Sequence, residues 1–252
     1  ANANAGVGVG SATMTNANRI DNYDDYINNH SEATNFNFAA KNPGSWANKL
    51  KVCTIDDAAD QTLTLASIDN SATVGMAVTT ALDGVVIPGA GSTSAFTGYL
   101  KSIITSINTT TNVADVKIVS RVATDGTETA IDYQEGADYA SFQAADQAYV
   151  INNSGTKVGT VAAVNTVVDW YDQQTLGLTN STVFWKSIAG KPKTNKYSLD
   201  RAGKNDGLHV VVVDDLGTVT GIQGQILEKH TNLSKALDAV SDVNSPQKIW
   251  YE

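Results

Sequence analysis

The middle of the chain is dominated by short apolar runs that alternate with polar and turn-forming residues. Such period-two alternation, bounded by Gly, Asn and Asp, is typical of β-strands joined by hairpins. Asp83-Gly84, Asp125-Gly126 and the segment 152–155 supply the turn chemistry between the runs. The pattern predicts a small all-β barrel or sandwich, with strands at 76–80, 99–107, 113–122, 130–133, 149–151 and 157–164.

Both flanks of this region show the spacing of amphipathic helices, with apolar residues three to four positions apart. Ile20, Tyr23 and Ile27 predict a short helix over 18–30. A second helix is predicted over 166–176. The flanks are therefore expected to pack helices, unlike the middle.

The strongest strand pattern is 208–213, which is apolar on both faces and so is expected at the centre of a sheet covered by helices. A hairpin is predicted to lead from it into a second strand at 218–222. A helix capped by Thr231 or Asn232 should follow, and 249–251 reads as the start of another strand.

These elements predict an α+β or α/β fold, in which a core with a mixed sheet and packed helices carries an inserted small all-β domain, a barrel or sandwich. The expected domains are 1–56, a flexible low-complexity start and the first part of the core; 57–165, the inserted β domain; and 166–252, the second part of the core with hairpin, helix and strand. Both ends of the sequence read as cuts in a longer protein.

The composition is that of a folded, acidic chain. The 252 residues include 17 Lys and Arg against 26 Asp and Glu, a formal net charge of −9, and hydrophobic residues make up 42%. This charge argues against general binding to a nucleic-acid backbone. No apolar run reaches the length of a membrane span, and no signal-peptide pattern is present, so we expect no membrane insertion.

The sequence shows no group of residues typical of an enzyme or of a metal site. Cys53 is the only cysteine, which excludes an intramolecular disulfide, and its alternating surroundings predict burial. His30, His209 and His230 lie far apart, without the spacing of metal ligands. We therefore expect no catalytic residue, no cofactor and no metal.

Two features leave alternatives open. Asp214 and Asp215 follow a buried strand and are the best candidates for paired carboxylates in a hydrolase, but adjacent residues point to opposite sides, and with Gly217 they make a good hairpin turn. A run of basic residues is either a solvated loop or a patch that docks onto the acidic surface of an identical neighbour; it comprises Lys186, Lys191, Lys193, Lys196, Arg201 and Lys204.

Two stretches on either side of the predicted β domain carry a resemblance. The first, 39–52, contains Gly-Ser-Trp-Ala-Asn at 44–48, ahead of a strand. The second, within 191–251, contains Arg-Ala-Gly-Lys-Asn-Asp at 201–206, ahead of His-Val-Val-Val-Val at 209–213. Both resemble tail sheath proteins of contractile-tailed bacteriophages, the second especially those of T4-like phages of cyanobacteria. That family has Arg-Gly-Gly-Lys-Asn-Asp, so Ala202 replaces the first glycine.

The resemblance covers roughly 39–56 and 166–252, and it implies a structural virion protein. Sheath subunits stack as six-fold rings around the tail tube, are assembled in a strained extended state and contract so that the tube passes through the host envelope. The partners implied are identical subunits and the tail tube protein. The place implied is the phage tail, assembled in the host bacterial cytoplasm. Terminal arms interlock neighbours in this family, so we expect the present fragment to be monomeric.

The alternative function is an outward-facing β binding module for a host surface glycan or a decoration protein, because small β-barrels often present such sites. A binding module of this kind should show a shallow groove lined by exposed aromatic side chains. The candidate aromatics are Tyr99, Tyr133, Tyr139, Phe142 and Tyr149, and core packing is the competing explanation for most of them.

Overall fold

The computed structural model contains two compact units. The sheet unit combines Ala1–Asp57 with Thr175–Glu252, and the barrel unit is Ala58–Gln174. The barrel unit therefore begins beside the expected boundary at 57 and ends after Gln174 rather than after residue 165. The residues described are 20–30, 38–40, 45–82, 85–86, 98–123, 125–137, 140–144, 146, 148–161, 167–241 and 247–249.

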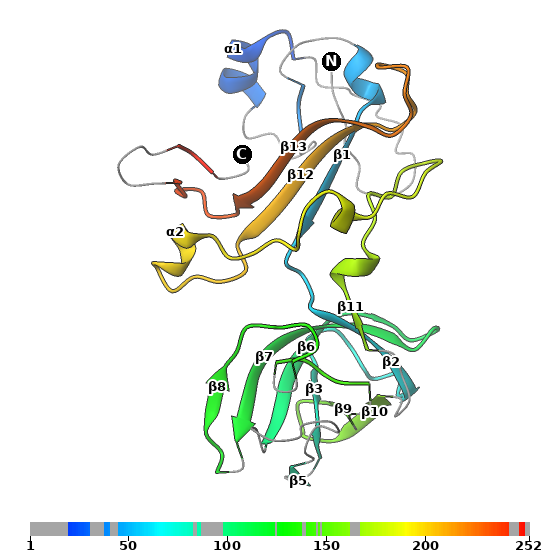
Figure 1. Ribbon diagram of the computed structural model, residues 1–252, viewed down its shortest axis with the longest axis vertical. Helices are drawn as coiled ribbons and strands as arrows, with labels where there is room; N and C mark the ends of the chain where they lie inside the picture. The colour runs from blue at the N-terminus through cyan, green and yellow to red at the C-terminus, as the bar shows by residue number, and fades with distance from the viewer. Residues whose placement is uncertain are drawn as a thin grey trace. The chain divides into compact units, whose positions relative to one another are not determined.

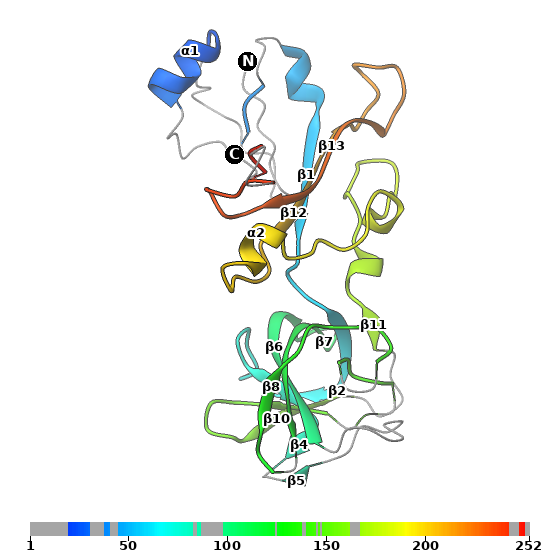
Figure 2. The same ribbon diagram turned by 60° about the vertical axis from the view of Figure 1, so that its left-hand side comes forward.

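Six antiparallel strands of the barrel unit close into a barrel (Figures 1 and 2). In order around it they are β2 (Gln61–Ile68), β10 (Lys157–Val161), β9 (Tyr149–Ile151), β3 (Ala77–Thr79), β6 (Gly98–Asn108) and β7 (Val113–Ala123), and the pairing of β2 with β7 closes the ring. Outside the ring, β8 (Glu128–Ala130) pairs with β7 and β11 (Val168–Asp169) with β2, while β4 (Ala81–Leu82) and β5 (Val85–Val86) pair with each other.

The long hairpin of β6 and β7 provides much of the barrel's interior. Along β6, Leu100 and Ile104 are buried, whereas Lys101 and Ile103 lie between the buried positions and are partly or well exposed. This alternation is typical of a strand that has one face toward the core and the other toward solvent. The strands predicted at 99–107, 113–122 and 149–151 are confirmed with nearly the same bounds.

Strand β2 was not predicted, although it completes the ring. Its polar residues Gln61 and Thr62 are buried, which hides the usual alternation. The Gln61 amide accepts from the backbone N–H of Phe142 at 2.8 Å and donates to the Phe142 carbonyl at 3.1 Å, and the Thr62 hydroxyl donates to Asp115 at 2.7 Å. Burial of these side chains is tolerated because each is hydrogen-bonded.

The sheet unit contains a three-stranded antiparallel sheet (Figure 1). Its strands are β1 (Lys51–Asp56), β12 (Gly207–Asp214) and β13 (Gln225–Ser234), with β12 in the centre. The central position predicted for 208–213 is thus confirmed. Val211 and Val213 are fully buried.

The predicted α+β or α/β fold class, with a core of packed helices, is wrong. Of the described residues, 40% are in strands and 12% are helical, and the only α-helices among them are α1 (Tyr23–Asp25) and α2 (Lys196–Leu199). The other helical segments have three to five residues each: a π-helical segment, Tyr26–His30, and 3-10 segments at Ser45–Lys49, Tyr171–Gln173 and Trp185–Ser187. Taken together, the described residues are mostly β, and their helical segments are too short to form a packed helical core.

Three element predictions fail because pairing or side-chain bonding prevails over local periodicity. The helix expected after Asn232 is absent, because β13 continues to Ser234 and pairs with β12. The helix predicted over 166–176 is replaced by β11 and a 3-10 turn, where the Asp169 carboxylate accepts from the backbone N–H of Tyr171 at 2.8 Å. The strand predicted at 218–222 is a loop.

Candidate functional site

Asp214, one of the two candidate catalytic carboxylates, is fully buried at the end of β12. Its carboxylate accepts hydrogen bonds from the backbone N–H groups of Thr218 at 3.0 Å, Val219 at 2.9 Å and Thr220 at 2.7 Å. It also accepts one from the Thr220 hydroxyl at 2.9 Å. Burial alone would raise its pKa, but these hydrogen bonds outweigh burial and hold the pKa below its ordinary value. A general acid would need the opposite shift.

Asp215 is turned toward other partners. Its carboxylate accepts the backbone N–H of Thr179 at 2.8 Å and the Thr179 hydroxyl at 2.6 Å. The two adjacent aspartates therefore do not form a carboxylate pair around a common site. Asp214 organises the loop that follows β12, and Asp215 fastens that loop to the segment around Thr179.

The histidines are also used structurally. His209 is buried in β12, where Nε2 lies 2.7 Å from the Gly190 carbonyl and Nδ1 lies 3.1 Å from the backbone nitrogen of Asn232. His30 lies 3.5 Å from Asp25, and His230 lies 3.3 Å from Glu228. Within the part of the chain that the structure describes, no group of three or more His, Cys, Asp or Glu side chains is arranged to hold a metal ion.

Cys53 is buried in β1, as predicted, and its Sγ lies 3.3 Å from the Leu176 carbonyl. Burial is the main cause that raises the pKa of its thiol to about 11; nearby Asp215 adds to the rise and Lys51 opposes it. The reactive thiolate is therefore scarce at neutral pH.

The basic residues of 186–204 are partly engaged within the sheet unit. Lys191 lies 3.1 Å from Asp57, and Lys196 lies 2.6 Å from Asp200. The Arg201 guanidinium stacks on the Tyr197 ring, with 3.6 Å between its central carbon and the ring centroid. Lys186, Lys193 and Lys204 are exposed.

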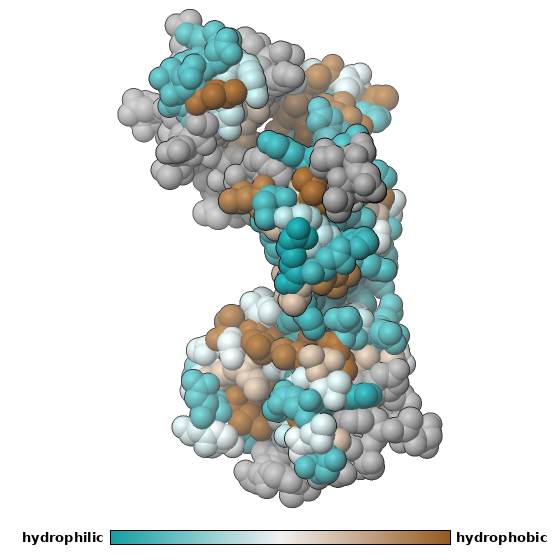
Figure 3. Space-filling view, turned by 90° about the vertical axis from the view of Figure 1, so that its left-hand side faces the viewer, coloured by the Kyte–Doolittle hydropathy of each residue, from teal (hydrophilic) through white to brown (hydrophobic). Residues whose placement is uncertain are grey.

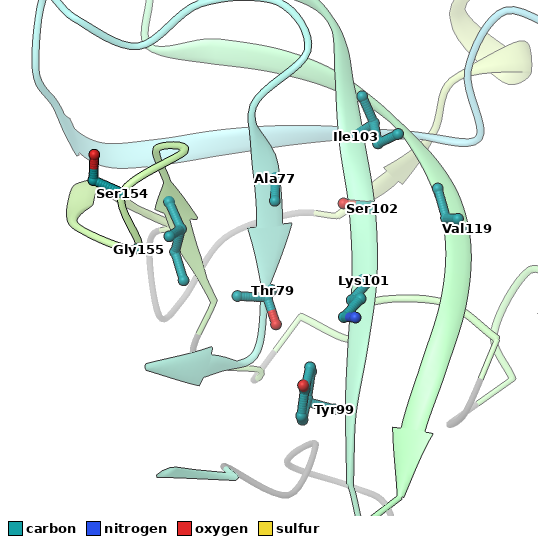
Figure 4. Close-up of a pocket in the computed structure, with 10 residues that line it drawn as sticks. Ala77, Thr79, Tyr99, Lys101, Ser102, Ile103, Val119, Ser154 and Gly155 are labelled. Atoms are coloured by element: carbon teal, nitrogen blue, oxygen red, sulfur yellow. The ribbon is translucent and has the colours of Figure 1, made fainter. Parts of the chain in front are cut away.

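The barrel unit carries an open groove of about 660 Å³ on its surface (Figure 4). Strand β6 contributes Tyr99, Lys101 and Ile103, and β7 contributes Val119. Ile151 of β9 also lines the groove, and further walls come from β3 and from the turn after β9. The Lys101 ammonium is paired with Glu128 at 2.9 Å, so the groove contains no uncompensated lysine charge.

Of the four candidate aromatics that the structure describes, only Tyr99 is among the residues that line this groove. Phe142 is buried in the core, and the Tyr133 hydroxyl donates to Asp169 at 2.7 Å. Lys157 lies over the Tyr149 ring at 4.7 Å from its centroid. Tyr139 lies outside the described residues.

Sequence reasoning missed the aliphatic residues of the groove. Ile103 and Val119 belong to strands that were predicted, yet a single strand does not reveal which outward residues of its neighbours lie beside it. The outward alternation of β6 was the available signal: Tyr99, Lys101 and Ile103 occupy every second position.

No protein-family model, curated protein or solved structure matches this chain. Among the helices that the structure describes, none is long and apolar enough to cross a membrane.

Proposed function

We propose that this chain is a structural virion protein, a subunit of a contractile tail sheath that polymerises around the tail tube and contracts to drive the tube through the host envelope. The support comes from the residues that resemble sheath proteins and from the edges of the sheet that they build. In this proposal the protein acts mechanically and needs no cofactor.

The backbone at Ala202 supports the resemblance. Ala202 has a φ of 58°, in the left-handed region that favours glycine, and sheath proteins have a glycine in the corresponding motif. The next residues of the motif lead to Asp206, whose carboxylate accepts the backbone N–H of Asn195 at 2.9 Å and bonds the Ser234 hydroxyl. The motif thus joins α2, the start of β12 and the end of β13.

The observation that carries the proposal is the exposed edge of β13. This strand has ten residues, most of them exposed, and in the described part of the chain only β12 pairs with it. An edge with which no further described strand pairs can be a template for a strand from another chain. Its last residues are engaged otherwise: the Ser234 N–H donates to the Ile249 carbonyl at 2.7 Å, and the Leu233 carbonyl accepts from the Asn195 side-chain amide at 3.2 Å. Sheath subunits interlock by adding strands to a neighbour's sheet, so the open edge fits the proposed role.

Electron microscopy with sedimentation tests this function. We expect the 252-residue chain alone to sediment as a monomer at micromolar concentration, and its complete open reading frame, expressed with a tail tube protein, to give hollow tubes with six-fold symmetry. Discrete particles under both conditions would count against the proposal.

The second candidate, a binding module in the barrel unit, is favoured only by the groove. Because its described lining has one aromatic residue, a decoration protein is the better ligand within this alternative. A glycan array probed with the labelled chain tests the glycan version: a ligand whose binding is lost in Tyr99→Ala would establish it.

A further inference from the structure

Residues 215–224 form the loop that joins β12 to β13, which we call the Asp214 loop (Figure 2). Three of its large apolar side chains are exposed to solvent. Leu216 is 48% exposed, Val219 42% and Ile222 61%. Single exposed apolar residues are ordinary, but three within a loop of ten residues concentrate apolar surface at one place in the chain, where contact with another molecule would bury it. Figure 3 shows that apolar residues also reach the surface of the barrel unit.

Hydrogen bonds constrain the backbone of the Asp214 loop. Besides the four bonds to the Asp214 carboxylate, the Gly221 N–H donates to the Gly217 carbonyl at 3.0 Å and the Gly224 N–H donates to the Asp214 carbonyl at 2.9 Å. Gly217 has a φ of 71°, and a Cβ there would lie 2.7 Å from the Gln223 nitrogen. Because the loop is already ordered, little conformational entropy is lost when its apolar side chains are buried.

The barrel groove offers a complementary hollow. Ile103 is 43% exposed and Val119 40% exposed, so apolar surface there is also open to water. Its volume of about 660 Å³ exceeds that of a few aliphatic side chains. A protruding apolar loop and an apolar groove on the same chain are the two halves of a head-to-tail contact between copies.

The distribution of charge favours the Asp214 loop of a second copy, rather than the groove of a second copy, as the partner of the barrel groove. The barrel unit has four Lys and Arg residues against twelve Asp and Glu residues, a formal net charge of −8. Two grooves face to face would bring two such acidic units together. The segment 216–227 has no ionisable side chain, and Lys101 in the groove is already paired with Glu128, so the loop can enter without leaving a charge unpaired.

We propose that the Asp214 loop of one copy docks, through Leu216, Val219 and Ile222, into the barrel groove of a second copy. The two surfaces differ, so the contact is heterologous and can repeat from copy to copy. One such contact is weak, because association must offset lost translational and rotational freedom, and it gains strength where many copies are held close together. In this respect the inference rests on the proposed sheath function.

Site-specific photo-cross-linking of the full chain tests this contact. A leucine analogue that carries a diazirine replaces Leu216, and equal amounts of isotopically light and heavy chains are irradiated and analysed by mass spectrometry. We expect cross-links between light and heavy chains that join position 216 to the β6–β7 hairpin. The matched control has the same analogue at Leu237, which is also exposed and lies outside the loop; it should give no such product.

A variant with a polar groove distinguishes specific docking of the loop from cross-links formed in random collisions. Ile103→Asn with Val119→Asn keeps the net charge and alters only exposed side chains, so the barrel should fold, as circular dichroism would check. We expect the cross-link yield from position 216 to fall about tenfold, which corresponds to 1.4 kcal/mol of binding free energy. An unchanged yield in this variant, cross-links only between two Asp214 loops, or none between copies would each overturn the inference. Tube formation is scored separately, so tubes without the cross-link would leave the sheath function intact.

Discussion

Ala202 is a residue whose backbone conformation suits a different side chain. Its φ of 58° places the Cβ too close to the following carbonyl oxygen, at a cost of about 1–2 kcal/mol for an L-residue. We expect Ala202→Gly to stabilise the chain by about 0.5–1 kcal/mol, because relief of this strain exceeds the entropy that glycine adds to the unfolded chain. Urea denaturation measures the change. A destabilised variant would show that the backbone here is unstrained.

Asp214 makes the stability of the sheet unit depend on pH. Its pKa in the folded state lies below the ordinary value of 3.8, so its contribution is fully present above that value and is lost as pH falls through the folded pKa. We expect Asp214→Asn to destabilise the chain at pH 7 and to reduce the loss of stability below pH 4. Urea midpoints measured across this range check both effects, and a mutant whose acid sensitivity equals that of the parent would contradict the assignment.

Predictions for single residues succeeded where the burial or direction of a side chain follows from its position within one strand. The alternation around Cys53 was enough to predict its burial, and the adjacency of Asp214 and Asp215 was enough to doubt a carboxylate pair. The network around Asp214 was not predictable, because its donors are backbone groups four to six residues further on, whose positions depend on the folded loop.

Within the Asp214 loop, two glycines differ in what surrounds them. A Cβ at Gly217 would meet backbone atoms at 2.7 and 2.9 Å, whereas nothing lies within 4 Å of a Cβ at Gly221; both have positive φ. We expect Gly221→Ala to cost about 1–2 kcal/mol from backbone strain alone and Gly217→Ala to cost more. Equal losses of unfolding free energy in urea would show that the loop is not closely packed at Gly217.

At the scale of elements, most strands of the barrel ring were predictable, whereas β2 and the outcome of the helices predicted over 166–176 and after Asn232 were not. The β6–β7 hairpin shows clear alternation, whereas the apolar spacing after Asn232 fits both a helix and a strand that faces a partner. Pairing of Leu208 with Leu233 decides for the strand. Local periodicity carries no information about that partner, so the predicted core of packed helices was wrong.

The edge of β13 gives a test of strand addition. Leu227 lies at a bulge between Ile226, which pairs with Val213, and Glu228, which pairs with Val212. Proline is tolerated at edge strands and bulges but cannot donate a hydrogen bond to an added strand. We expect Leu227→Pro to leave the circular dichroism spectrum unchanged and to abolish tubes, with Leu227→Ala as the matched control that still assembles. Tubes from the proline variant would exclude strand addition at this part of the edge.

At the scale of the whole molecule, formal charge is concentrated in one unit. The barrel unit accounts for −8 of the total of −9, so the sheet unit is close to neutral. A near-neutral unit with an open strand edge is suited to contact between copies, and an acidic unit resists contact with its own kind. The charged residues are visible in the sequence, but the net charge of each unit could be assigned only with the unit boundaries that the structure provides.

The most direct test of the central claim is negative-stain electron microscopy of the complete open reading frame expressed with a tail tube protein. A sheath subunit should form hollow tubes with six-fold symmetry around the tube protein, and Leu227→Pro should prevent them. If the purified protein remains as discrete particles in the presence of assembled tail tubes, the sheath function is contradicted.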